Sequence, residues 1–199
     1  MESGIQQLIS EVEREGGFAP AAEQLFQALY DELHRLAERQ LRRSGGQLTL
    51  GATTLLHEAY LHLAGREEVS FPDRARFMGY AARSMRHLVI DYARRSRAQK
   101  RGGDAFEITL TGSVAQVAGN SDQVVELERL SEALDKLAAR EPALAQLVDL
   151  HFFCGYKFEE IATMRGVSAR TVQRDWRKAR VLLLRAVVDH SKALTRALR

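Results

Sequence analysis

The sequence predicts an all-α protein made of two small helical domains joined by a flexible linker. Apolar residues recur at steps of three and four along most of the chain, which is the spacing of an amphipathic helix. Strand-like alternation is nearly absent, and its best stretch, 106–110, is short. The chain has three prolines, and each lies where a helical pattern starts or breaks.

The first predicted domain covers residues 18–100 and contains three helices. The first helix runs from about 21 to 42, behind Pro20, and two glycines end it. The second runs from about 53 to 64, and the third follows a polar connection, 66–73, and extends to about 97. The apolar stripe of the third helix consists of Phe77, Ala81, Met85, Leu88 and Tyr92.

The predicted linker covers residues 101–122, where four glycines and several Ser and Thr replace the helical pattern. The second domain, 123–188, begins with a leucine stripe and continues through a helix that starts at Glu141-Pro142. Two more helices follow, and we expect the last to end near Val188 with the tail 189–199 frayed. Whether residues 1–17 are ordered stays open.

Residues 158–177 have the spacing of a helix-turn-helix. Gly166 suits the positive φ of the turn, and Ser168 can cap the second helix. Val167 is expected to fill the corner, and Val172 to anchor the second helix in the core. An ordinary helical hairpin in a bundle would show much of the same pattern.

The outer face of the second helix in this motif is basic. It carries five cations against one acid, and Thr171 and Gln173 add short polar groups near its start. A helix in the major groove needs such donors for base edges at its start and cations for phosphates along its flanks. The cations are Arg170, Arg174, Arg177, Lys178 and Arg180. The pattern favours DNA binding over the simple hairpin.

A second basic surface ends the third helix of the first domain. Seven cations follow one another there with one acid, Asp91, between them: Arg83, Arg86, Arg94, Arg95, Arg97, Lys100 and Arg101. The cations favour binding to a nucleic-acid backbone. The alternative is that they form a solvated surface at the end of the helix, where the helix dipole is negative. Two basic patches on two domains suggest one DNA contacted at two places.

Composition excludes several other classes. The single cysteine, Cys154, rules out an intramolecular disulfide and a cysteine-based zinc cage, and it suits a small core residue. No apolar run approaches the roughly 18 residues of a membrane span, and the first residues lack the pattern of a signal peptide. We expect a cytoplasmic protein without a membrane partner, cofactor or metal.

Three segments together resemble the sigma-70 family of RNA polymerase sigma factors, in its extracytoplasmic-function (ECF) group. Residues 54–63, Thr-Leu-Leu-His-Glu-Ala-Tyr-Leu-His-Leu, resemble the helix that docks on the polymerase coiled coil. Residues 77–95, ending Leu-Val-Ile-Asp-Tyr-Ala-Arg-Arg, resemble the part that melts and reads the −10 element. Residues 156–176 resemble the motif that reads the −35 element. Thr54, His57 and His62 depart from the residues that the family often has there.

The resemblance implies a sigma factor that binds core RNA polymerase and directs promoter recognition and melting. The residues expected to face the polymerase are Thr54, His57, Glu58 and Leu61. Those expected at the −10 DNA are Arg83, Arg86, His87, Arg94 and Arg95, with the loop 65–73 holding a flipped base. Those expected at the −35 duplex are Ser168, Arg170, Thr171, Gln173, Arg174, Arg177 and Lys178. The sequence leaves open whether an anti-sigma factor is a further partner.

Two other functions fit the sequence less well. An enzyme is disfavoured because His57 and His62 are five residues apart, whereas the metalloprotease motif places two His four apart on one helix face. Neither a Gly-rich phosphate loop nor a nucleophile elbow occurs, so we expect no catalytic residues. A helix-turn-helix repressor or activator would explain 158–177, but it gives no role to Glu58 and its helix or to the first basic cluster.

Overall fold

The computed structural model describes residues 2–15, 20–44, 49–64, 71–101 and 121–197. Within these ranges every regular element is a helix, which confirms the all-α class. The first half holds α1 (Glu2–Glu15), α2 (Pro20–Ala28), α3 (Tyr30–Arg43), α4 (Ala52–Ala64) and α5 (Arg74–Arg101). The second half holds α6 (Ser121–Arg140), α7 (Pro142–Val148), the π-helix η1 (Asp149–Cys154), α8 (Phe158–Arg165) and α9 (Ala169–Ala197). The weak strand candidate, 106–110, lies outside the described residues.

The stripe predicted as one helix over 21–42 is two helices, α2 and α3. The break is at Leu29, whose backbone (φ −105°, ψ 7°) leaves the helical range. Leu29 is nevertheless buried, as are Leu25 and Leu33 on either side. The apolar spacing therefore continues across the bend, which is why the sequence pattern alone did not reveal it.

Both ends of the described chain are helical, which answers the question left open for residues 1–17 and corrects the prediction for the tail. Residues 2–15 form α1, and Ile5 and Ile9 are buried. Helix α9 extends to Ala197, so the expectation that it ends near Val188 and frays beyond was wrong for its backbone. The frayed-tail prediction relied on the general tendency of chain ends to be poorly ordered, but a helix already held by packing can continue to its end.

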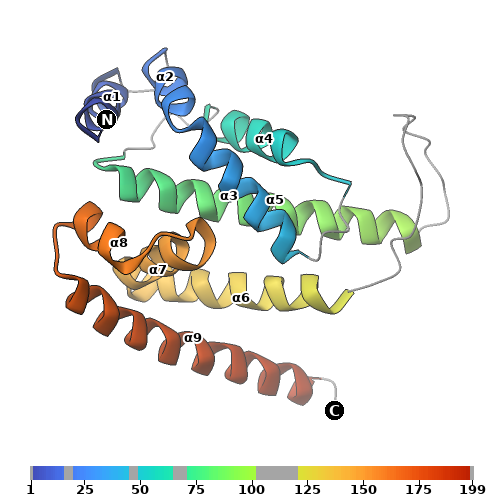
Figure 1. Ribbon diagram of the computed structural model, residues 1–199. Helices are drawn as coiled ribbons and strands as arrows, with labels where there is room; N and C mark the ends of the chain where they lie inside the picture. The colour runs from blue at the N-terminus through green and yellow to red at the C-terminus, as the bar shows by residue number, and fades with distance from the viewer. Residues whose placement is uncertain (1, 16–19, 45–48, 65–70, 102–120, 198–199) are drawn as a thin grey trace.

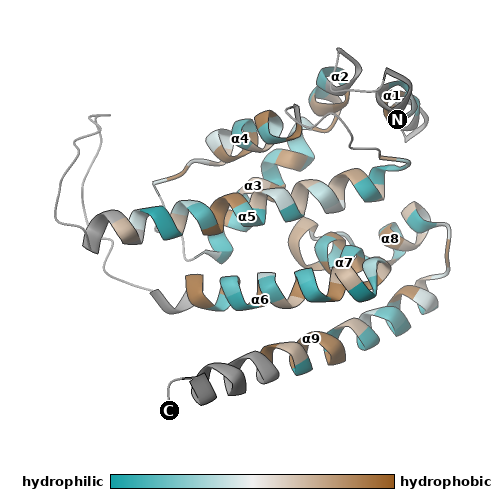
Figure 2. Ribbon diagram, turned by 180° about the vertical axis from the view of Figure 1, so that it is seen from behind, coloured by the Kyte–Doolittle hydropathy of each residue, from teal (hydrophilic) through white to brown (hydrophobic). Residues whose placement is uncertain are grey.

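The helices form layers around α5 (Figure 1). Helices α3 and α4 pack on one side of α5, and α6, α7 and η1 pack on another. Helix α9 lies across α6, α7 and α8 on the outside. Most helices show both hydrophilic and hydrophobic bands along their length (Figure 2), as expected for helices with one buried and one solvent face.

Short sequence signals set where these helices start. Asp73 accepts a hydrogen bond from the backbone N–H of Arg76 at 2.7 Å, which satisfies one free donor at the start of α5. Pro142 opens α7, where its missing N–H costs nothing. Gly155, with φ 78°, ends η1 in the left-handed conformation and turns the chain toward α8.

The two halves of the chain share a continuous hydrophobic core. Phe153 in η1 and Met78 in α5 are both almost fully buried. The Cys154 thiol, also buried, lies 3.6 Å from the backbone oxygen of Met78. Cys154 is therefore the small core residue that the sequence predicted. The division into domains at 18–100 and 123–188 stays a prediction, and most of the linker lies outside the described residues.

Candidate functional site

Helices α8 and α9 form the helix-turn-helix. Gly166 ends α8 with φ 63°, and the Ser168 hydroxyl accepts a hydrogen bond from the backbone N–H of Thr171 at 3.1 Å. Ile161 and Val172 are fully buried where the two helices cross. These observations confirm the predicted turn, cap and anchor.

The role predicted for Val167 was wrong. The residue is 39% exposed rather than buried in the corner. An aromatic cluster holds α8 against α9 instead: the His151 ring stacks on Phe158 at 4.3 Å and meets Trp176 edge-on at 4.6 Å. Phe158 belongs to α8 and Trp176 to α9, and η1 brings His151 to both.

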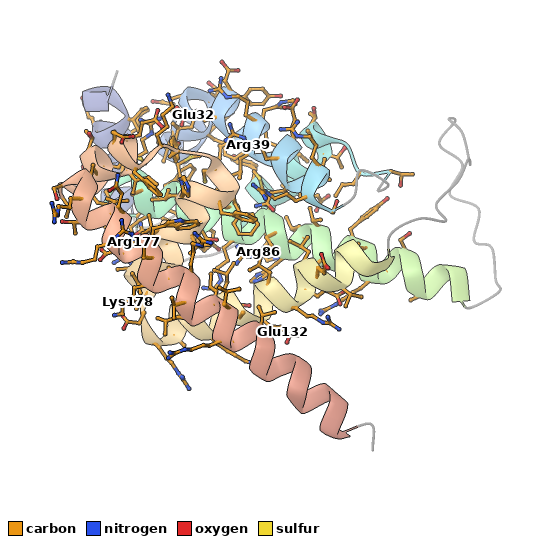
Figure 3. All side chains as sticks on the ribbon, turned by 60° about the horizontal axis from the view of Figure 1, so that its bottom comes forward. Glu32, Arg39, Arg86, Glu132, Arg177 and Lys178 are labelled. Carbon is orange, nitrogen blue, oxygen red and sulfur yellow. The ribbon has the colours of Figure 1, made fainter. Side chains whose placement is uncertain are left out.

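The outer face of α9 brings the predicted −35 residues together. A surface hollow of about 520 Å³ is lined by Ser168, Arg170, Thr171, Gln173, Arg174 and Arg177. All of these except Thr171 are exposed. The seventh, Lys178, is also exposed, and its ammonium contacts the Glu141 carboxylate at the start of α7 at 2.7 Å. Figure 3 labels Arg177 and Lys178, neighbours on this helix.

One face of α4 carries the four residues predicted to meet the polymerase. Thr54, His57, Glu58 and Leu61 are all exposed, and Leu61 is 50% exposed. The opposite face is buried through Leu55, Leu56, Ala59 and Leu63. The positions i, i+3, i+4 and i+7 share one face of a helix, so the four predicted residues form one continuous surface.

The five residues predicted at the −10 DNA lie along α5, but they are not equally accessible. Arg83, Arg94 and Arg95 are exposed, and His87 is half-buried. Arg86 is 1% exposed. Its guanidinium donates to Asp149 Oδ1 at 2.6 Å and to the Ser131 hydroxyl at 3.2 Å.

Two further acids of the second half, besides Asp149, contact the same basic face of α5, and the sequence did not predict these contacts. Asp135 pairs with Arg83 at 2.9 Å and with His87 at 3.3 Å, and Glu128 pairs with Arg94 at 3.1 Å. Glu128 and Asp135 are seven residues apart on α6, which puts them on one helix face. This seven-residue spacing was the sequence signal that could have predicted an acidic face on α6.

The contact between the two halves shifts the pKa values of two groups. Burial raises the pKa of Asp149, and the Arg86 guanidinium opposes this rise only in part. Burial lowers the pKa of His87, and the positive charge of Arg86 lowers it further, against the opposite effect of Asp135. The neutral form of His87 is therefore favoured where it lies between the two halves.

The loop expected to hold a flipped base, 65–73, lies mostly outside the described residues. Within the described part, Phe71 is buried edge-on against Phe77 at 5.4 Å and against Tyr80 at 5.2 Å. Phe77 is thus a core residue, as its place in the stripe predicted.

A family model described as "ECF sigma factor" matches residues 2–189. The chain belongs to the ECF sigma factor family. Members of this family are regulatory transcription factors that act as RNA polymerase sigma factors in transcription initiation, which implies core polymerase and promoter DNA as partners. The comparisons with curated proteins and with solved structures gave no match for this sigma factor. Among its described helices, none combines the length and the apolar character that crossing a bilayer requires.

Proposed function

We propose that this sigma factor binds core RNA polymerase through α4, reads the −35 element through α9 and melts and holds the −10 element through α5. The family supports the overall role, and the described surfaces support the assignment of each contact. The observation that carries the proposal is the exposed hollow on α9, because residues suited to base edges and residues suited to phosphates line it together.

At the −35 element, the start of α9 would enter the major groove. Arg174 is the best candidate for a base contact: its side chain is 76% exposed, and its only described partner is the adjacent Asp175 at 3.2 Å. A guanidinium can bind the O6 and N7 acceptors of guanine together. Arg170 and Arg177, on either side, would contact phosphates.

At the polymerase, α4 would present Leu61 for packing and Glu58 for a basic partner. A small apolar centre with polar neighbours is typical of a protein interface. At the −10 element, the exposed Arg83, Arg94 and Arg95, together with the half-buried His87, would follow the backbone of the melted strand. Arg86 would join them only by leaving its buried pair with Asp149. The loop 65–73 would hold a flipped base, because melting is favoured when a pocket traps the unpaired form.

Run-off transcription tests the proposal. Purified bacterial core polymerase is incubated with fragments of the source genome, with and without this protein. We expect discrete new transcripts that require both components, and a variant with Arg170 and Arg174 changed to Glu should lose them. Absence of transcripts, with specific binding of duplex DNA by the protein alone, would favour the repressor-or-activator function and overturn the polymerase contacts.

A further inference from the structure

One acid, Asp175, lies among the cations at the start of α9. Its carboxylate oxygen Oδ1 accepts hydrogen bonds from Arg174 Nε at 3.3 Å and from Arg174 Nη2 at 3.2 Å. The two side chains differ in accessibility, because that of Arg174 is 76% exposed and that of Asp175 is 20% exposed. The carboxylate therefore lies close to the body of the protein, and the guanidinium that it holds faces solvent.

The place of Asp175 in the helix explains its partial burial. Val172, three residues earlier, and Ala179, four residues later, are both fully buried. Residues three and four apart share one side of a helix, so Asp175 lies beside the buried stripe of α9. Arg174 is one position earlier, about 100° around the helix. Adjacent positions do not face each other, so the arginine side chain must lean around the helix to reach the carboxylate.

Neither charge nor stability accounts for an acid at this position. Among the described residues, Arg174 lines the hollow at the start of α9 whereas Asp175 does not. A carboxylate beside a DNA-binding surface repels phosphates, which weakens binding to any sequence. An ion pair with so exposed a partner adds little to the stability of the fold. The orientation of Arg174 is what the pair does determine.

The geometry of the pair leaves one edge of the guanidinium for DNA. The group is planar and rigid, and it carries N–H donors on Nε, Nη1 and Nη2. The Asp175 carboxylate takes the side formed by Nε and Nη2. The end formed by Nη1 and Nη2 points away from that carboxylate, with an N–H on each nitrogen. Two such parallel donors fit the O6 and N7 acceptors of guanine in the major groove.

We propose that Asp175 is a positioning residue, which holds the Arg174 guanidinium in the orientation that reads a guanine of the −35 element. The inference rests on the proposed function of α9. A long side chain loses conformational freedom when it binds, and a side chain that is already held loses less. Asp175 acts through Arg174 and does not touch the base. Discrimination for guanine therefore depends on both residues, although only Arg174 contacts it.

A double-mutant cycle tests this role in the holoenzyme formed from core polymerase and the full-length protein. Its affinity is measured for a promoter found by run-off transcription and for single-base −35 variants of that promoter. We expect Asp175→Ala to lower discrimination about threefold to tenfold, at the same base pair that Arg174→Ala affects. In the double variant the two losses should not add, because Asp175 has no effect without the guanidinium. Glu126→Ala removes an exposed acid from α6 and should leave discrimination unchanged.

Affinity for a duplex of unrelated sequence separates positioning from damage to the fold. Asp175→Ala removes a negative charge beside the phosphates, so this affinity should rise about twofold while discrimination falls. Asp175→Asn keeps the size of the side chain and an oxygen acceptor, and it should show the same two changes, each smaller. A fall in affinity for both the promoter and the unrelated duplex would make Asp175 a structural residue and overturn the proposal.

The same measurements distinguish the positioning role from the function on which it rests. Absence of transcripts with the native protein would overturn both. Transcripts together with unchanged discrimination in Asp175→Ala would keep the function and overturn the positioning role. So would a loss at a different base pair that adds to the loss in Arg174→Ala, because Asp175 would then accept directly from a base such as cytosine.

Discussion

Arg174 combines a long, exposed side chain with a place in the first turns of α9. We expect Arg174→Ala to weaken discrimination at one −35 position by about 1–3 kcal/mol, because a bidentate contact to one base is lost. Binding to a series of single-base promoter variants measures this. Arg185→Ala, which removes an exposed cation further along α9, is the control and should not alter discrimination. A uniform loss across all variants would make Arg174 a phosphate contact.

Glu58 lies at the centre of the exposed face of α4. We expect Glu58→Lys to abolish co-purification with core polymerase, because a like charge then faces the basic partner. The full-length variant should still bind a −35 duplex, since α9 is unchanged. Glu126→Lys makes the same charge change on an exposed face of α6 and should leave co-purification intact. Retained co-purification of the Glu58 variant would remove Glu58 from the docking surface.

Glu32 makes stability depend on pH. Burial raises its pKa, but hydrogen bonds from Tyr156 and Arg74, together with nearby cations, outweigh burial, and the pKa lies below its ordinary value of 4.5. Folding therefore favours the carboxylate. Its stabilisation is complete above pH 4.5 and is lost as the pH falls through the lowered value.

In the variant Glu32→Gln, the side chain at position 32 does not titrate. We expect the free energy of unfolding of the native protein to fall more steeply below pH 4.5 than that of the Gln variant. Urea unfolding at a series of pH values measures both slopes, and equal slopes would contradict the assignment to Glu32.

At the scale of the element, the turn between α8 and α9 depends on the backbone of Gly166. Its φ is 63°, and a Cβ there would meet nothing within 4 Å, so any cost of Gly166→Ala comes from the backbone alone. We expect a loss of about 1–2 kcal/mol in the free energy of unfolding. The control is Gly4→Ala in α1, where a Cβ also meets nothing; that change should stabilise the protein slightly. Denaturant unfolding of both variants checks the two signs.

Features of the helices were predictable where residues within a few positions determine them. The cap at Ser168, the turn at Gly166 and the buried Val172 all follow from interactions within a few residues. The break at Leu29 was not predictable, because the side chain keeps its place in the stripe while the backbone turns. The exposure of Val167 depends on the direction of the chain after the left-handed Gly166, and the sequence pattern does not specify that direction.

For the whole molecule, the sequence indicated the all-α class and the surfaces on α4 and α9. Helical spacing alone places exposed residues on one face, whatever their distant partners are. The surface on α5 was different. Arg86 was expected at DNA, yet in this structure it is a buried residue whose partners, Ser131 and Asp149, are 45 and 63 positions away. Pairings over such separations depend on how complete helices pack, and a single sequence does not specify that packing.

By the proposed function, the buried Arg86 would have two uses that compete, its pair with Asp149 and a contact with the −10 DNA. A change that strengthens the pair with Asp149 would also make Arg86 harder to release to DNA. Selection for a firmer pair would then weaken promoter binding, and selection for stronger transcription would loosen the pair. The strength of one ion pair, that of the Arg86 guanidinium, would then limit how this chain can evolve.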